Sequence, residues 1–352
     1  MLALVILIGL ASLSLLMVAH ELGHFFLARL YGVRVEEFGL GLPPRIFGVK
    51  RGETIYSVNA IPFGAFCKMA GEEDPAAPGS LAGKGRGSRL FILGGGALMN
   101  ILLALVIMSI VFTVPADVQV GKVVVTEVAP DSPAAMAGIE PGDVILRVED
   151  VPITNVSDLH REMLPRLGEK TVIVLGDGAP RPVQVVPRIN PPEGQGALGI
   201  TVDLQDATTV RQSLGFFEAV PRGLSEFWDT LAVYKNGMVS VFKGEAPADF
   251  VGPVGLVQIT GEVAVQAGAR SLLQAVALIS FLLGVFNLLP LPAIDGGRIV
   301  FVLIELARRG KRISPKVEGI VHSIGFFLLI LLLAVVTIQD IARLASGGSF
   351  VP

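Results

Sequence analysis

The sequence predicts an α-helical polytopic membrane protein with one soluble domain inserted between its membrane spans. Hydrophobic residues make up 52% of the 352-residue chain and charged residues only 17%, whereas an ordinary soluble domain has about 25% charged residues. The charge is also unevenly distributed, because four windows contain no charged side chain: residues 1–19, 90–114, 271–294 and 319–339. Between the second and third windows, charges of both signs are mixed as in a soluble domain.

Each uncharged window is long enough to cross about 30 Å of hydrocarbon as a helix, which takes roughly 20 residues. Lipid cannot satisfy free backbone N–H and C=O groups, so such spans must be helical. We therefore expect four transmembrane helices, at residues 2–30, 90–115, 270–290 and 317–341. The first has neither a basic leading segment nor a small-residue cleavage site, which disfavours a cleaved signal peptide.

Composition excludes several other classes of protein. A disordered chain would be rich in charge, and a disulfide scaffold needs several cysteines, whereas Cys67 is the single cysteine here. The net charge of −3 leaves no basic excess, so we expect no nucleic-acid partner. The bilayer itself is the expected environment.

The distribution of basic residues predicts the orientation of the spans, because Lys and Arg collect in cytoplasmic loops. They cluster after the first span and between the last two, at Arg34, Arg45, Lys50, Arg51, Lys68, Lys84, Arg86, Arg89, Arg298, Arg308, Arg309, Lys311, Arg312 and Lys316. Both loops are expected in the cytoplasm. Residues 116–269 and both termini are then extracytoplasmic.

The inserted segment, residues 117–206, alternates strand patterns with turns and two helices. Strands are expected at Gly121–Val128, Val144–Val148, Thr171–Leu175, Arg181–Val186 and Leu198–Val202. Helices are expected at Ser132–Gly138 and Ser157–Leu167, with Ser132 and Ser157 as N-caps. Gly176, Asp177 and Gly178 are typical of a hairpin turn.

The stretch from Ser132 to Ile145, SPAAMAGIEPGDVI, makes residues 116–206 resemble a PDZ domain. The resemblance implies that an extended peptide or C-terminus binds by strand addition. The groove would lie between strand 198–202 and helix 157–167, with Leu198, Gly199 and Ile200 as binding residues. The alternative is a small α/β insert that only separates the membrane spans.

An aromatic stripe follows the insert, within an amphipathic or linker region at residues 207–269. Its members are Phe216, Phe217, Val220, Leu224, Phe227, Trp228, Leu231 and Tyr234. A helix at the membrane interface fits this pattern, since Trp and Tyr favour that zone. Simple packing against the insert is the other interpretation.

The first span carries an H-E-x-x-H motif, with His20, Glu21 and His24 at membrane depth, where polar groups are costly and indicate function. Histidines four residues apart lie on one helix face and can bind one Zn²⁺. Glu21 can then serve as general base toward the attacking water. The alternative is polar contacts between helices. We interpret the other two histidines, His160 and His322, as structural.

Asp295 is the candidate third ligand, because catalytic zinc usually has three protein ligands. It ends the third uncharged window, in the sequence NLLPLPAIDGG from Asn287 to Gly297. The first and third spans both run from outside to inside, so the motif and Asp295 fall near the same leaflet. Pro290 and Pro292 cannot continue a helix, and irregular backbone is tolerated at this depth where it lines a cavity.

His20–His24 and the N-x-x-P-x-P-x-x-D-G pattern from Asn287 to Gly296 together resemble the site-2 protease family of intramembrane zinc metalloproteases. Within that family, the four spans and the inserted PDZ domain are similar to the bacterial regulator of sigma-E protease. The resemblance covers nearly the whole chain. It implies His20, His24 and Asp295 as Zn²⁺ ligands, Glu21 as the catalytic base, and Asn287 as a catalytic or substrate-contacting residue. Polar packing between helices is the alternative for Asn287.

Two more stretches match the family. Ile46–Val49 and Thr54–Ile61 predict a hairpin, followed by PFGAFCKM from Pro62 to Met69. The family implies a membrane-associated β element here, with substrate-binding residues Gly64, Phe66 and Met69. Gly94 to Asn100, reading GGGALMN, is interpreted as a close helix contact, with Asn100 behind the metal ligands.

The resemblance implies regulated intramembrane proteolysis, with a stress-response role, in a bacterial inner membrane. The substrates would be single-span proteins already cut by another protease, such as an anti-sigma factor, and remnant signal peptides, with the PDZ domain as a gate. The membrane halves would comprise residues 1–115 and 270–352, and the active site would lie near the cytoplasmic leaflet. The alternative is a metal transporter or scaffold, which would need a continuous polar path that the apolar outer halves of the spans lack.

Overall fold

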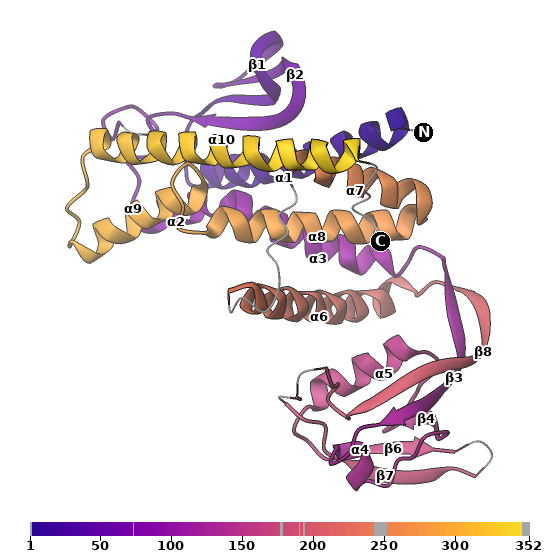
Figure 1. Cartoon of the computed structure of the whole chain (residues 1–352). Helices are drawn as coiled ribbons and strands as arrows, with labels where there is room; N and C mark the ends of the chain where they lie inside the picture. Colours follow the sequence, from indigo (N-terminus) through magenta and orange to yellow (C-terminus); the bar gives the residue numbers. More distant parts are fainter. Residues whose placement is uncertain are drawn as a thin grey trace. The chain divides into compact units, whose positions relative to one another are not determined.

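The computed structural model divides the chain into two compact units, which are described separately (Figure 1). It describes residues 2–72, 74–176, 179–189, 191–192, 194–242 and 252–346, with the backbone alone for residue 229 and residues 232–242. The membrane unit comprises Met1–Val114 and Leu214–Pro352, and the insert comprises Pro115–Ser213. The predicted turn residues Asp177 and Gly178 and the side chain of Tyr234 lie outside the described part.

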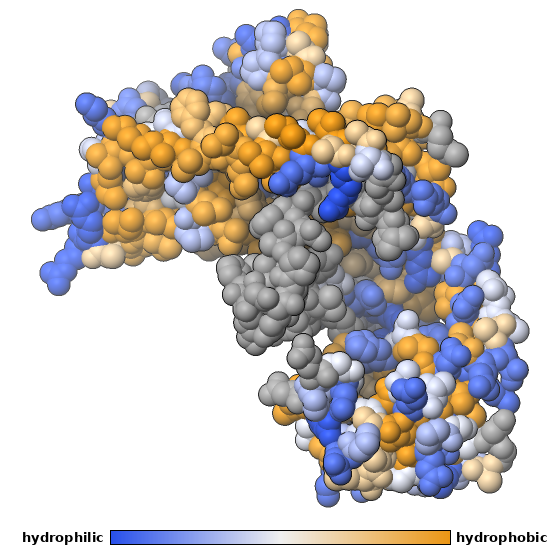
Figure 2. Space-filling view, in the orientation of Figure 1, coloured by the Kyte–Doolittle hydropathy of each residue, from blue (hydrophilic) through white to orange (hydrophobic). Residues whose placement is uncertain are grey.

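The membrane unit is a bundle of apolar helices. Its described helices are α1 (Leu2–Leu30), α2 (Arg86–Leu93), α3 (Gly95–Val111), α6 (Phe216–Phe242), α7 (Pro253–Gln266), α8 (Gly268–Leu288), α9 (Asp295–Ala307) and α10 (Pro315–Ala345). By length and composition, α1, α8 and α10 can each cross a membrane. Figure 2 shows α10 as an almost continuous hydrophobic surface, where Phe327 and Leu331 are exposed. The chain is a polytopic membrane protein.

The second apolar window is broken, which differs from the continuous helix expected at 90–115. Helices α2 and α3 meet at Gly94 and are bent by 46°, and they amount to one span only if counted together. Three successive glycines, Gly94 to Gly96, stand at the bend. Glycine has low helix propensity and allows the backbone to turn, so the break falls at this point.

Small residues bring the membrane helices into close contact. A β-carbon added to Gly23 of α1 would lie 2.1 Å from the carbonyl oxygen of Gly95 in α3. Likewise, one added to Gly9 would lie 2.1 Å from the carbonyl oxygen of Val257 in α7. The backbone of α1 therefore approaches two neighbouring helices more closely than larger side chains would allow.

The membrane unit also contains a small sheet made of β1 (Val35–Arg51) and β2 (Thr54–Met69), much longer strands than the expected hairpin. Both strands fold back on themselves. Leu40 pairs with Val58 and with Ala65, while Ser57 pairs with Gly39 and with Gly48. The first half of β1 therefore lies between the two halves of β2.

This sheet extends along α1 to about the middle of that helix. Phe63 packs against the cluster that contains Leu13 and Leu16, and a β-carbon on Gly64 would lie 3.1 Å from Cε of Met17. Ile46 and Phe47 on β1 are exposed and apolar. The β element accordingly lies at the depth of the α1 span.

The insert is a sheet with two helices. Its strands are β3 (Ala116–Val128), β4 (Val144–Val148), β5 (Val151–Pro152), β6 (Thr171–Leu175), β7 (Arg181–Val185) and β8 (Ile200–Gln212). Their order is β7-β6-β4-β3-β8, and β5 pairs with β4. Helices α4 (Pro133–Met136) and α5 (Val156–Met163) accompany it, the latter followed by a 3₁₀ turn at Leu164–Arg166. Val123, Ile145 and Ile173 lie in its buried core.

The local signals in the insert located its expected strands and helices, but one cap and several bounds differ. Strand β3 begins at Ala116 rather than Gly121, and α5 ends at Met163 rather than Leu167. Ser132 caps α4, as expected, because its Oγ accepts a hydrogen bond from the N–H of Ala135 at 3.1 Å. Ser157 was the wrong cap for α5. Asn155 caps this helix instead, accepting from the N–H of Asp158 at 2.8 Å, and asparagine is as good a cap as serine. Strand β8 also continues well beyond Val202.

Helix α6 packs in the membrane unit through part of the aromatic stripe. Phe227 is buried against Ala104 of α3 and Phe281 of α8, and its ring meets that of Phe281 edge-on at 5.0 Å. Trp228 and Phe217 remain exposed. The buried side of the stripe therefore faces membrane helices, while the exposed aromatics fit an interfacial position.

Candidate active site

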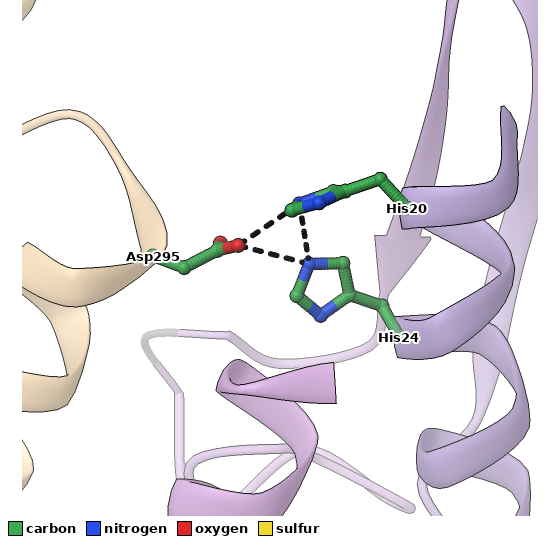
Figure 3. A group of neighbouring side chains, drawn as sticks. All are labelled: His20, His24 and Asp295. Carbon is green, nitrogen blue, oxygen red and sulfur yellow. Dashed lines mark hydrogen bonds and ion pairs between the residues drawn. The ribbon is translucent and has the colours of Figure 1, made fainter. Parts of the chain in front are cut away.

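Three predicted metal ligands converge from two distant parts of the chain (Figure 3). His20 and His24 project from one face of α1, and Asp295 lies at the first residue of α9. Oδ2 of Asp295 is 3.0 Å from Nε2 of His20 and 3.2 Å from Nε2 of His24. The two imidazole nitrogens are 3.3 Å apart. One atom of each residue thus points to a common centre.

The orientation of His24 is fixed by the end of α2. Its Nδ1 lies 2.8 Å from the carbonyl oxygen of Ile92, in the last turn of that helix, where carbonyls lack their usual helical partners. The ring therefore donates its Nδ1 proton to this carbonyl and directs Nε2 toward Asp295. A backbone or carboxylate acceptor behind a histidine is typical of metal ligands.

Asn100 stands behind His20 in a similar way. Its side chain is 1% exposed, and its Nδ2 lies 3.4 Å from Nδ1 of His20. Its Oδ1 is buried without a hydrogen-bond partner in the described part of the chain. Turning the amide by half a rotation places Oδ1 against Nδ1, where it can accept the proton of an imidazole that binds metal through Nε2.

Gly96 is a site residue that the sequence interpretation missed, since the glycine run was assigned to helix contact alone. A β-carbon at Gly96 would lie 2.4 Å from Nε2 of His20 and 2.5 Å from Nε2 of His24. The first turn of α3 therefore forms one wall of the site. No periodicity or motif spacing distinguishes this glycine from its two neighbours.

The segment before Asp295 is held by α10. The backbone N–H of Ala293 donates to Nδ1 of His322 at 2.9 Å, and Ala293 has φ +76°, a strained value for a residue with a side chain. A β-carbon on Gly325 would lie 2.2 Å from Cβ of Pro292. The loop between α8 and α9 is thus fixed from α10 at two adjacent residues.

Helix α9 is also tied to α2, which holds the carbonyl behind His24. Buried Glu305 accepts from Arg89 at 2.6 Å, and Arg312 lies 3.4 Å from the same carboxylate. Arg298 pairs with Glu72 at 2.6 Å. These ion pairs hold Asp295 in place opposite α1.

Glu21 lies between the two histidines on α1 and is part-buried. Its carboxyl is next to the backbone of Cys67 in β2, so the β element borders the site. Cys67 is free and half-buried. Glu21 is close to the three ligands without being one of the converging atoms.

The donor set fits a zinc ion. Two imidazole nitrogens and one carboxylate oxygen lie within 4.8 Å of one another, and zinc binds this combination in catalytic sites that keep a fourth position open. Both histidines can bind the ion through Nε2, because each has an acceptor for its Nδ1 proton. For His24 the acceptor is a backbone carbonyl, and for His20 it is the otherwise unpartnered Oδ1 of Asn100.

Comparison with known proteins identifies the family. The sequence profile of peptidase family M50 matches residues 8–332. The chain belongs to peptidase family M50. Relatives named as zinc metalloproteases include one from Clostridium perfringens, which is 37% identical over 96% of this chain and 98% of its own length. Another, from Clostridium acetobutylicum, is 34% identical over 96% of this chain and 97% of its own length. Zinc metalloprotease RasP of Oceanobacillus iheyensis is 28% identical over 92% of this chain and 96% of its own length.

The predictions of a site-2 protease family member, a zinc metalloprotease and a Zn²⁺ cofactor are therefore confirmed. The M50 peptidase is an integral membrane protein, with α1, α8 and α10 as membrane-spanning helices, and it is an intramembrane protease.

The other predicted site residues of the M50 peptidase lie in several places. The amide of Asn287 donates to the carbonyl of Leu283 in its own helix, at 2.8 Å. Phe66 covers Gly39 within the small sheet, and Met69 is buried in the cluster with Val33 and Val35. The structure brings none of these three into hydrogen-bond contact with the metal-site residues in the described part of the chain.

The residues expected to bind peptide in the insert lie at the start of β8. Leu198 is buried in the core of the insert, Gly199 has φ +72°, and Ile200 begins the strand. Strand β8 ends the sheet order beside β3 and contacts α5. The expected groove residues therefore lie next to an edge strand and a helix.

Proposed function

We propose that this M50 peptidase cleaves single-span membrane proteins within the membrane, as the second cut of regulated intramembrane proteolysis. One observation carries the proposal: His20 and His24 on a membrane-spanning helix meet Asp295 at 3.0 and 3.2 Å. Such groups are costly at membrane depth unless they serve function. Their site lies in the inner part of α1, so the cut falls within a substrate's own span.

The chemistry is divided among a few side chains. When bound by His20, His24 and Asp295, zinc polarises the scissile carbonyl and makes water more acidic. Glu21 accepts a proton from the attacking water and delivers it to the nitrogen of the leaving amine. Asn287 would stabilise the developing oxyanion after releasing the carbonyl of Leu283, since an amide N–H suits that role.

A substrate helix must unwind before it can be cut, because its carbonyls are hydrogen-bonded. The half of β2 that ends at Met69 borders Glu21 through Cys67. In the described residues, that half pairs with β1 along one side only. A strand edge can hold an extended peptide by main-chain hydrogen bonds. The region of Gly64 and Phe66 would then align the scissile bond with the site.

The insert would act as a PDZ-type filter for substrates. Support comes from the edge strand β8 beside α5, the arrangement in which PDZ domains bind peptides by strand addition. The substrates would be proteins already cut by another protease, such as an anti-sigma factor, and remnant signal peptides. This filter would make proteolysis conditional on an earlier signal, as in a stress response.

The proposed topology has four spans in a bacterial inner membrane, with α2 and α3 as the second, bent span. The basic loops lie in the cytoplasm and the insert and termini outside. Residues 1–115 and 270–352 would form the membrane halves that hold the four spans, with the PDZ domain at 116–206. Helices α6 and α7, from the amphipathic region at 207–269, would pack against those spans. The site would lie near the cytoplasmic leaflet.

The test is cleavage of a purified single-span substrate by the Glu21→Gln variant. The amide cannot accept the proton of water, so cleavage should fall about a hundred- to ten-thousand-fold while bound zinc, measured by elemental analysis, stays unchanged. Glu262→Gln, in helix α7 of the membrane unit, is the matched control and should cleave normally. Normal cleavage by Glu21→Gln would show that Glu21 is not the catalytic base. If the wild type leaves the substrate intact, the proposed function is wrong.

A further inference from the structure

A cavity of about 470 Å³ lies at the end of α1, away from the metal site. Arg29 lines it from the last turn of α1. Gly32 and Arg34 line it from the segment between α1 and β1. Arg51 and Gly52 line it from the turn between β1 and β2. Three arginines therefore converge on one hollow from separate parts of the chain.

The cavity has an excess of positive charge. Its lining holds three guanidinium groups and one carboxylate, that of Glu53. Arg34 has Glu36 at 3.3 Å, but its Nε is buried with no hydrogen-bond partner in the described part of the chain. Arg29 and Arg51 form no ion pair with any described residue. Arginine presents a planar fork of donors that matches phosphate oxygens.

The backbone leaves room for a ligand. Gly52, in the turn, has φ +62°, and a β-carbon there would meet nothing within 4 Å. Gly32 also has a positive φ, +67°, and a β-carbon on it would lie 3.4 Å from Nζ of Lys84. A fourth cation thus stands close to the three arginines.

The position of the cavity along α1 indicates where the ligand comes from. Leu30 and Phe26 are 76% and 55% exposed, so the last turn of this span presents apolar side chains to the lipid tails. Arg29 lies in this same turn and Arg34 follows four residues after Leu30, at the level where a span reaches the membrane surface. Phospholipid phosphates occupy that level, and basic pockets beside spans bind anionic headgroups.

We propose that this cavity binds the phosphate of an anionic phospholipid headgroup. The lipid would connect the end of α1, the helix that carries both histidine ligands, to the turn of the β element. Free phosphate has the same chemistry, so the two sources are separated by experiment. The proposal is independent of the substrate and of the protease mechanism.

The test compares the full-length wild type with the Arg29→Gln/Arg51→Gln variant in vesicles of phosphatidylcholine, alone or mixed with phosphatidylglycerol. The number of phosphatidylglycerol molecules retained after extraction is counted by native mass spectrometry, and affinity is measured by titration. The variant should bind this lipid about ten- to thirtyfold more weakly. The matched control, Arg308→Gln/Lys311→Gln, removes two exposed cations elsewhere and should bind normally.

Three outcomes would overturn the proposal. The first is equal lipid binding by the variant and the wild type. The second is an equal loss in the control pair, which would indicate general surface charge. The third is that inorganic phosphate alone stabilises the protein against unfolding and displaces the lipid from it, which would assign the cavity to a free anion. If the double variant fails to fold in phosphatidylcholine, the exposed single change Arg51→Gln decides the same question with a smaller expected loss.

Discussion

Gly96 contributes to the metal site by having no side chain. The two Nε2 atoms of His20 and His24 occupy the volume that a β-carbon on this residue would fill. The ligands can therefore face Asp295 only while the first turn of α3 has a glycine at position 96. A residue with no functional group thus determines whether three functional groups can share one ion.

We predict that Gly96→Ala disrupts the metal site. The added methyl would displace both imidazoles, so zinc affinity should fall about tenfold or more, in the range seen when support for a ligand is lost. The measurement is a competition titration with a fluorescent zinc chelator, together with cleavage of a single-span substrate. Gly87→Ala is the control, because a β-carbon there meets nothing within 4 Å. Wild-type zinc affinity in Gly96→Ala would contradict the steric argument.

Sequence reasoning located the residues whose chemistry is unusual for their surroundings. His20 and His24 are separated by one helical turn, and Asp295 is a charge at membrane depth. Their residue types and positions were therefore enough to predict them as metal ligands. Gly96 is ordinary in a membrane helix, where small residues usually mark helix contacts. The rotamer of Asn287, turned toward Leu283, depends on local geometry that no motif encodes.

At the scale of elements, the loop that carries Asp295 depends on a helix far along the chain. Helix α10 reaches it through His322 and Gly325. Near its other end, Asp340 accepts from the N–H of Gly255 in α7 at 2.8 Å and from that of Gly252 at 3.3 Å. Helix α10, whose outer surface is otherwise exposed, is thus fixed at two places.

We predict that His322→Leu weakens zinc binding and His322→Asn preserves it. Asparagine can present Oδ1 near the position of Nδ1 and accept from the N–H of Ala293, whereas leucine leaves that part-buried donor unpaired. Zinc affinity should fall about tenfold in the leucine variant, as measured by the same chelator competition. Equal affinity in both variants would show that the hydrogen bond does not position Asp295.

Helices and strands were predictable where neighbouring residues determine their bounds, and less so where pairing with distant segments does. Strands β4 and β6 were expected at their observed bounds because short Val-rich runs stand between turns. Strand β1 was expected only at Ile46–Val49, since its first half is set by pairing with both halves of β2. The bend between α2 and α3 was missed because hydropathy continues through Gly94 without change.

At the scale of the whole molecule, the insert leaves and rejoins the membrane unit at neighbouring positions. The N–H of Leu214 donates to the carbonyl of Phe112 at 2.8 Å, so the two ends of Pro115–Ser213 start close together. Insertions of this kind interrupt a fold without separating its parts. The membrane unit should therefore survive removal of the insert.

We predict that replacing residues 115–213 with a short Gly/Ser linker leaves zinc binding intact and removes selectivity between substrates. A filter that excludes uncut substrates would be lost, so full-length substrate should be cleaved at a rate approaching that of pre-cut substrate. Both rates are measured in vesicles with the purified variant. If neither rate changes, the insert has no gating role, and if bound zinc is lost, the membrane unit depends on it.

The small sheet beside α1 has a consequence for the supply of water. Each peptide bond that is hydrolysed consumes one water molecule, and the hydrocarbon core holds almost none. Backbone groups at a sheet edge cannot stay bare in lipid, so wherever the rim of β1 and β2 is not covered by protein, solvent must accompany it inward. Where that rim is uncovered, the strands that border Glu21 would therefore keep water at the depth where the reaction consumes it.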